Sequence, residues 1–212
     1  MLTPLNEGVF NFFFSFFYMD LVNKFCEENN LLLGEKIAKG WTSFIYTAEN
    51  KFGKKFILKV LREKSNRKEM VKKESEYLLL ANSVKVGPKF VKADFEKNIV
   101  MYEYVDGIFM SDWIFECNNK KLLLKFLKEI FSQTKKLDEL GLDHGQLAGA
   151  GKNVLVEKGK PVIIDFEKAS TKRKVHNSSI LESYFFRNPN SVIVKKIKEI
   201  LGADFSKNKK FV

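Results

Sequence analysis

Two polar residues flank a short predicted hairpin in the second half of the chain, and their types suit a divalent cation. The stretch NVLVEKGKPVIID begins with Asn153 and ends with Asp165. With Gly159 at the centre of the turn, Val154 faces Ile164 and Asn153 faces Asp165, with Cβ atoms about 5 Å apart. Mg²⁺ prefers a few oxygen ligands together with substrate phosphates. The pair therefore predicts a Mg²⁺ site, the alternative being a polar pair that only caps the hairpin.

A second candidate pair lies in the first half. Lys59 sits inside the apolar run FILKV, where an ammonium group without a carboxylate partner would be costly. In the helix predicted next, Glu74 is four residues after Met70 and four before Leu78, on the apolar stripe, whereas Glu76 is not. The pattern predicts a Lys59–Glu74 ion pair that holds phosphates. A lysine that reaches solvent from an edge strand is the alternative.

These residues belong to a series of motifs, in chain order AKGWTSFIY, FILKV, KESEYLLLA, MYEYVDG, HGQL and IIDFEKA. Each motif is weak alone, but their order and spacing over residues 33–170 resemble the RIO-like and KEOPS-kinase-like small archaeal serine/threonine protein kinases. The resemblance implies a compact, two-lobed protein-kinase-like fold of the α+β class, with a β-rich N-lobe and a reduced helical C-lobe. It implies ATP and Mg²⁺ as cofactors.

The resemblance also assigns binding residues. The nucleotide-binding loop has a single glycine in place of three. The expected ATP-binding residues are Gly40, Thr42 and Ser43 in that loop, Lys59 with its partner Glu74, and Glu103 and Val105 in the hinge that reads adenine through backbone groups.

HGQL resembles the HGDL of the family's catalytic loop, so Gln146 stands where a catalytic Asp accepts the proton of the substrate hydroxyl. A Gln amide accepts a hydrogen bond but is no base near neutral pH. Because phosphoryl transfer depends largely on positioning and electrostatic stabilisation, Gln146 is expected to orient a hydroxyl or water for slow transfer. Asp143 is a candidate substitute base, or it caps the loop after Gly141. The loop before Asn153 is expected to be two residues longer than in the family, and Glu167 replaces the glycine of DFG.

The elements that must position these residues follow from the apolar pattern. EKIA, FIYTAE and KFILKVL predict a three-stranded meander, and KFVKADF with NIVMYEYV a second hairpin. Helices are predicted over residues 65–82, over KKLLLKFLKEIFSQTKKLDELG, which Gly141 ends, and over SVIVKKIKEILG. DHGQLAGAGK is predicted to be a loop. We expect an N-lobe over residues 19–105 and a C-lobe over 106–212.

Composition sets the remaining bounds. The chain has 212 residues, of which 45% are hydrophobic and 30% charged, as in globular proteins. The Phe-rich segment 1–18 is shorter than the ~20 residues of a membrane span and has no signal-peptide pattern. We expect the functional chain to begin at Met19, with a Phe-rich interfacial anchor as the alternative. Cys26 and Cys117 are expected to be buried and reduced, in a cytoplasmic protein without stable membrane insertion.

Net charge is +11, and residues 168–212 carry eleven lysines and arginines against three carboxylates, or +8. This basic third is expected to contact RNA or an acidic protein, the alternative being a solvated face. We expect an ATP-binding RIO-like kinase or ATPase that transfers phosphoryl groups to a Ser/Thr hydroxyl of a protein substrate or to water. The alternatives are a pseudokinase that binds nucleotide in an RNA-processing or tRNA-modifying assembly, and a small-molecule phosphotransferase.

Overall fold

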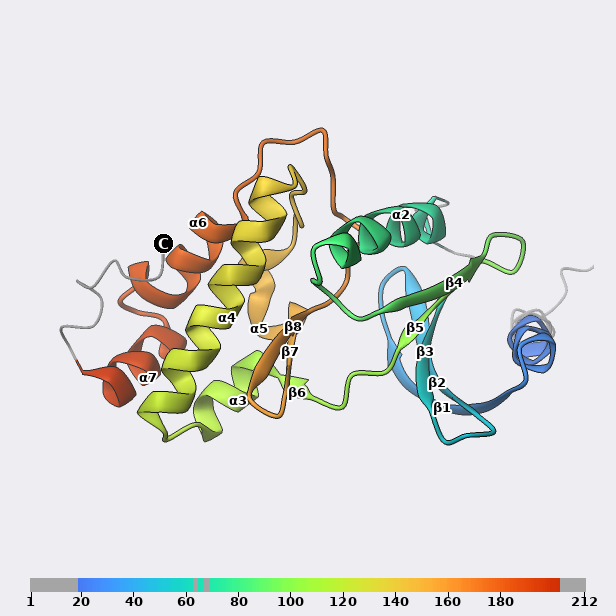
Figure 1. The fold of residues 1–212 in the computed structure, drawn as a ribbon, viewed down its shortest axis with the longest axis horizontal. Coiled ribbons are helices and arrows are strands. Elements are labelled where there is room, and N and C mark those ends of the chain that lie inside the picture. The colour runs from blue at the N-terminus through green and yellow to red at the C-terminus, as the bar shows by residue number, and fades with distance from the viewer. Residues whose placement is uncertain (1–18, 63–64, 67–68, 203–212) are drawn as a thin grey trace, which may run out of the picture. The chain divides into compact units, whose positions relative to one another are not determined.

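The computed structural model describes residues 19–62, 65–66 and 69–202. The Phe-rich segment 1–18 and the end of the basic third therefore lie outside the described residues. The chain divides into two compact units (Figure 1). The first extends to Lys72 and includes Val91–Tyr104, and the second combines Lys73–Phe90 with the chain from Val105 onward.

The first unit is built on a five-stranded sheet of order β1-β2-β3-β5-β4. Its strands are β1 (Leu31–Lys39), β2 (Ser43–Asn50), β3 (Lys55–Leu61), β4 (Phe90–Asp94) and β5 (Ile99–Glu103). The pairs β1–β2, β2–β3 and β3–β5 are antiparallel. The predicted meander and second hairpin are therefore confirmed.

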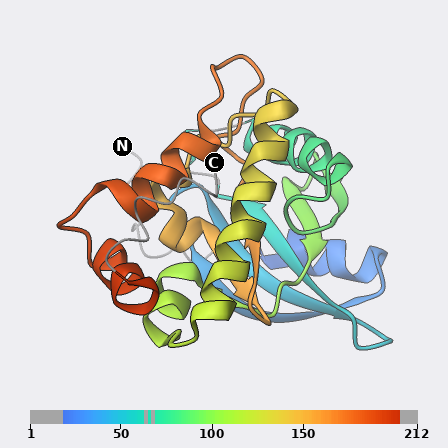
Figure 2. The ribbon, with the colours of Figure 1, turned by 60° about the vertical axis from the view of Figure 1, so that its left-hand side comes forward.

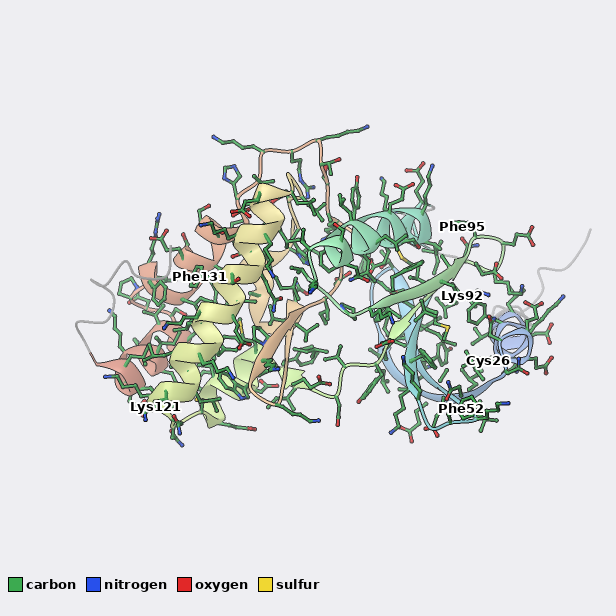
Figure 3. The ribbon with its side chains drawn as sticks, viewed as in Figure 1. Cys26, Phe52, Lys92, Phe95, Lys121 and Phe131 are labelled. Atoms are coloured by element: carbon green, nitrogen blue, oxygen red, sulfur yellow. The ribbon has the colours of Figure 1, made fainter. Side chains whose placement is uncertain are left out.

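A helix over residues 19–28 supplies the other half of this unit's core. Its apolar residues are buried against side chains of β2, β3 and β5; they are Val22, Phe25 and Cys26. Cys26 is labelled in Figure 3. Burial raises the pKa of its thiol to about 11, with a smaller contribution from Glu27. Cys26 and Cys117 are both buried free thiols, as the sequence predicts.

Helix α2 (Met70–Ser83) follows the predicted apolar stripe, because Met70, Val71, Leu78 and Ala81 are buried. Gly87, beyond its end, has a φ of +84°, and a Cβ there would meet Leu78 Cδ1 and Phe166 Cε2 at 3.0 Å each. A glycine is thus required both by the backbone and by the packing around Phe166.

The second unit is mostly helical and carries a small sheet of order β6-β7-β8. Its elements are β6 (Ile108–Phe109), α3 (Met110–Glu116), α4 (Lys120–Glu139), the 3₁₀ turn η1 (Leu147–Gly149), α5 (Ala150–Asn153), β7 (Val154–Glu157), β8 (Lys160–Ile163), α6 (Asn177–Glu182), the π-helix η2 (Ser183–Arg187) and α7 (Val192–Leu201). The α+β, kinase-like fold class is therefore confirmed.

Helix α4 organises this unit's core. The helical spacing of its sequence predicts one apolar face, and every residue of that face is buried, together with Phe126; the predicted residues are Leu123, Leu127, Ile130, Phe131, Thr134 and Leu137. Phe126 contacts Phe185 edge to face, and Phe131 stacks on Phe186. Figure 3 labels Phe131, and Figure 2 shows α4 beside the hairpin of β7 and β8. Gln133 Nε2 of α4 donates to the Pro161 carbonyl of β8 at 2.7 Å.

The predicted register of that hairpin is wrong by one residue. Val154 pairs with Ile163, not Ile164. The reason is the turn: Lys158 and Gly159 both have positive φ, 50° and 78°, which is the geometry of a two-residue type I′ turn. A turn centred between these two residues shifts the whole ladder by one position.

The loop predicted over residues 143–152 is also wrong in its second half, where η1 and α5 form. Gly151 allows this close packing, since a Cβ there would meet the Tyr184 hydroxyl at 2.7 Å and Ser111 Cβ at 3.3 Å.

Of the helices in the described part of the chain, none combines the length and apolar character needed to cross a membrane.

Candidate functional site

A network of hydrogen bonds joins the three residues around which the site was predicted in the second unit. Gln146 Nε2 donates to Asp165 Oδ2 at 3.2 Å. Asn153 Nδ2 donates to the backbone carbonyl of Gln146 at 2.8 Å. Gln146 thus lies between Asn153 and Asp165 and bonds to both of them.

The corrected register changes how Asn153 and Asp165 are related. Asn153 lies opposite Ile164, whose N–H donates to the Asn153 carbonyl at 3.0 Å. Asp165 has a φ of 68°, in the left-handed region that Asp tolerates better than most residues. The chain therefore turns out of the β ladder at Asp165, and the predicted face-to-face pairing of the two side chains is wrong.

Asp165 is instead grouped with two other carboxylates. Carboxylate oxygens of Glu74, Asp165 and Glu167 all lie within 4.8 Å of one another, and Glu74 is only 1% exposed. Gln146 Oε1 is buried and accepts no hydrogen bond from the described residues. Three carboxylates beside an amide oxygen are hard oxygen donors, the kind that Mg²⁺ prefers. The residues present therefore fit a Mg²⁺ ion.

Two residues that the sequence reasoning missed hold the backbone of this loop. Asn177 is fully buried. Its Nδ2 donates to Asp138 Oδ1 at 2.9 Å and to the Leu142 carbonyl at 2.7 Å, while its Oδ1 accepts from the His144 N–H at 2.9 Å. Asp138 also accepts from the backbone N–H groups of Asn177 and Ser178. The end of α4 and the start of α6 thereby fix residues 142–144.

His144 fixes the other side of the loop. It is fully buried, and its Nε2 donates to the Ile164 carbonyl at 3.0 Å. Its ring meets the Phe166 ring edge to face, with centroids 4.9 Å apart. Since Ile164 and Phe166 flank Asp165, His144 connects the segment of Gln146 to the segment of Asp165.

Asp143 is engaged in an ion pair. Its carboxylate, 8% exposed, accepts from Arg173 Nε at 2.8 Å. The backbones of Asp143 and Ser170 form a β-bridge, and Arg173 also donates to the Lys168 carbonyl. These bonds tie the segment after the metal motif to the start of HGQL. They favour a structural role for Asp143 over that of a substitute base.

The nucleotide-loop residues lie in the first unit. Gly40, Thr42 and Ser43 form the turn between β1 and β2, closed by the Gly40 N–H donating to the Ser43 carbonyl at 2.8 Å. Lys59 lies on β3 between Ile45 and Val100 and is 4% exposed. Its predicted partner Glu74 belongs to the second unit, so the ion pair stays a prediction.

The hinge residues fall on either side of the boundary between the units, with Glu103 in the first and Val105 in the second. The Glu103 side chain forms an ion pair with Lys54. The Val105 carbonyl accepts from the Gly107 N–H at 3.0 Å. The assignment of adenine binding to this segment stays a prediction.

A pocket of about 510 Å³ opens in the second unit beside Ala148 of η1. Its other walls come from α6 and the π-helix η2 and from the residue before them; these residues are His176, Ser179, Ile180, Ser183, Tyr184 and Arg187. The π-helix is rare and often occurs at functional sites. Burial raises the pKa of Tyr184, so its hydroxyl remains protonated at neutral pH. The pocket presents hydroxyl groups, the imidazole of His176 and the guanidinium of Arg187, and no carboxylate lies among its lining residues.

Two comparisons with known proteins bear on the family of this chain. An uncharacterized protein of Methanocaldococcus jannaschii is 36% identical over 75 residues, a stretch that covers 35% of this chain and 63% of that protein, less than two thirds of its length. The model of the RIO domain matches residues 40–185, which contain both predicted nucleotide motifs and the carboxylate group around Asp165. The chain therefore belongs to the RIO-domain family, a kinase-like, ATP-binding family of atypical serine/threonine kinases.

Proposed function

We propose that this protein is a cytoplasmic, Mg²⁺-dependent phosphotransferase that moves the terminal phosphoryl group of ATP slowly to a Ser/Thr hydroxyl of a protein or to water. The observation that carries the proposal is the hydrogen bond from Gln146 to Asp165, within a group of three carboxylates that fits Mg²⁺. Bound Mg²⁺ would neutralise the charge of the phosphates and of the departing ADP.

The chain's own residues would then position the reaction. Gln146 Nε2 holds the Asp165 carboxylate in place. Gln146 Oε1, which is buried and has no hydrogen-bond partner among the described residues, would accept from the attacking hydroxyl once acceptor binding exposes it. Asn153 fixes the backbone of Gln146 from the other side. The acceptor proton would leave late and, without a side-chain base, would pass to an oxygen of the transferred phosphoryl group and then to solvent. The reaction would be slow, but positioning supplies most of the catalysis.

We propose that residues of the first unit bind the nucleotide. The turn of Gly40, Thr42 and Ser43, closed by the bond from the Gly40 N–H to the Ser43 carbonyl, would receive phosphates at its exposed tip, Trp41. Lys59 would bind them through its ammonium group. The backbone between Glu103 and Val105 would read the adenine edge. The position of Lys59, buried on β3 between Ile45 and Val100, supports this role.

The acceptor would approach through the pocket beside Ala148. Lys172 and Lys174, which precede α6, are exposed, and Arg187 in the pocket wall is paired with Glu182 at 3.0 Å. An acidic partner therefore suits this surface. We propose a protein substrate here rather than RNA, because the exposed lysines suit an acidic segment and Tyr184 already contacts Phe185 edge to face, with ring centroids 5.3 Å apart.

The alternative is a pseudokinase that binds nucleotide without turnover, and Gln146 itself favours it, since it is no base. The deciding experiment measures Mg²⁺-dependent ATP binding and turnover for the wild type, Lys59→Met and Asp165→Ala, with the exposed Lys125→Met as the matched control. We expect both site variants to lose productive ATP binding while the protein stays folded. Normal turnover in both would refute the kinase function, and binding without turnover in the wild type would establish the pseudokinase.

A further inference from the structure

One side chain in the first unit binds nearly the whole turn that was predicted to be the nucleotide loop. Arg62 Nη1 donates to the Gly40 carbonyl at 2.9 Å and to the Trp41 carbonyl at 3.2 Å. The backbone N–H of Arg62 donates to the Thr42 carbonyl at 2.8 Å. Three consecutive carbonyls of the turn are therefore bound by a single residue.

The guanidinium is itself held in place. It lies over the Phe44 ring, 5.3 Å from the ring centroid, a geometry in which a cation and an aromatic face attract each other. Arg62 follows β3 directly, and Phe44 lies on β2. The guanidinium group is therefore held next to β2 and β3 in addition to its hydrogen bonds to the turn.

The direction of these bonds decides what the turn offers a ligand. In a trans peptide the N–H points opposite to the C=O. When the Gly40 carbonyl points at the guanidinium, the following N–H group, that of the exposed Trp41, points away from it. The carbonyl groups of Gly40 and Trp41, which would repel a phosphate, are bound to Arg62 instead. The guanidinium group also adds a permanent positive charge next to the turn.

We propose that Arg62 is a positioning residue that fixes the 40–43 turn in its phosphate-binding shape, in a loop that has one glycine instead of three. This inference rests on the proposed function. Glycines let a loop backbone approach a phosphate closely; here the guanidinium fixes the orientation of the peptides instead. Trp41 at the tip of the turn is 90% exposed and reports on the turn directly.

The test compares Arg62→Met, Arg62→Lys and the control Lys55→Met, an exposed cation of β3, in the full chain carrying Trp113→Phe. Mg-ATP binding is followed by Trp41 fluorescence, and amide hydrogen exchange of residues 40–43 is measured without nucleotide. We expect Arg62→Met to weaken ATP binding about tenfold, as loss of charged hydrogen bonds does, and to speed exchange of the turn about tenfold. Turnover at saturating ATP should hold, and Arg62→Lys should recover part of the affinity.

The outcomes separate this inference from the proposed function. Tight binding by the wild type with unchanged affinity in Arg62→Met overturns the role of Arg62 alone. Faster exchange with unchanged affinity overturns it too, because Arg62 would then serve only the stability of the turn. Absence of ATP binding in the wild type overturns both proposals. If Arg62→Met does not fold, Arg62→Lys provides the test. Its affinity for Mg-ATP must then be lower than that of the wild type, by less than a factor of ten.

Discussion

Gln146 and Asp165 are joined by a hydrogen bond from the amide nitrogen to the carboxylate, 3.2 Å long. A donor at position 146 therefore stabilises the ionised Asp165 before any cation is bound. An Asp at the same position would place a fourth carboxylate near those of Glu74, Asp165 and Glu167. The native residue thus makes the site less repulsive at the cost of a proton acceptor.

Gln146→Asp is expected to raise ATP turnover. General base catalysis contributes roughly 10²- to 10⁴-fold in favourable cases, and part is lost here because the Asp side chain is one methylene shorter. The same variant should be less stable than the wild type in EDTA and should recover with Mg²⁺, since like charges require a cation. Initial rates and thermal unfolding with and without Mg²⁺ measure both effects, with Gln146→Glu as the control for reach. Loss of the wild-type turnover in Gln146→Asp would show that the amide itself positions the acceptor.

Asp143→Ala and Arg173→Met are expected to have nearly the same effect, and the double variant little more, because the two side chains form one ion pair. We expect a coupling of about 1 kcal/mol in the free energy of unfolding, since Arg173 is half exposed. Chemical denaturation of the four proteins measures it. If Asp143 were the substitute base, Asp143→Ala would abolish turnover while Arg173→Met would not.

Asn177→Asp should destabilise the protein by about 3 kcal/mol, because it replaces two donated hydrogen bonds with a carboxylate facing Asp138. Asn177→Ala should cost about 1–3 kcal/mol, the range for unsatisfied buried partners. Ser179→Ala, an exposed neighbour in α6, serves as the control. Equal stability of Asn177→Asp and Ser179→Ala would contradict the role assigned to Asn177.

The turn of the β7–β8 hairpin predicts opposite effects at adjacent positions. Gly159→Ala should cost about 1–2 kcal/mol, since a positive φ is unfavourable for a residue with a Cβ, and the added methyl would meet Leu122 Cδ1 at 2.8 Å. Lys158→Asn should stabilise by ~0.5 kcal/mol, because Asn favours the first position of a type I′ turn. Urea denaturation resolves the two signs. A destabilising Lys158→Asn would contradict the type I′ assignment of this turn.

Binding of an acidic partner should depend on salt and on the exposed lysines before α6. Lys172→Glu with Lys174→Glu should abolish binding of a glutamate-rich peptide, measured by fluorescence anisotropy between low and high salt. Lys121→Glu with Lys128→Glu, exposed lysines of α4, makes the same charge change elsewhere and should have a smaller effect. Tighter binding of single-stranded RNA, falling with a log–log slope of about −0.7 per neutralised phosphate, would contradict the choice of a protein partner.

The sequence predicted those features that rest on local pattern. The stripe of α2 and the apolar face of α4 are periodic, and β1 to β3 are short runs rich in β-forming residues, so each could be identified without tertiary information. The register of the β7–β8 hairpin could not be predicted in this way. It depends on a positive φ at Lys158, and lysine is not a residue type that indicates such a conformation. One residue in that turn then moved Asp165 out of line with Asn153.

The residues that support the site were missed for a related reason. Asn177 and Arg62 act through the backbone of segments far from them in sequence, and neither sits in a recognisable motif. Glu167 was noticed only as the replacement of a glycine, whereas the structure places its carboxylate with those of Glu74 and Asp165. A pattern of residue types reveals ligands more readily than it reveals what orients them.

The second unit is discontinuous, taking Lys73–Phe90 from one part of the chain and everything from Val105 onward from another. Glu74 is therefore synthesised long before Asp165 and Glu167, and the cation site cannot close until the ribosome has passed both of them. Closing so long an intervening segment carries an entropic cost, though one that grows slowly with length. A fragment that begins at residue 106 would lack Glu74 and the glycine that receives Phe166. Cation binding at the proposed site would therefore require a chain that has been synthesised through Glu167 and has brought Glu74 to it.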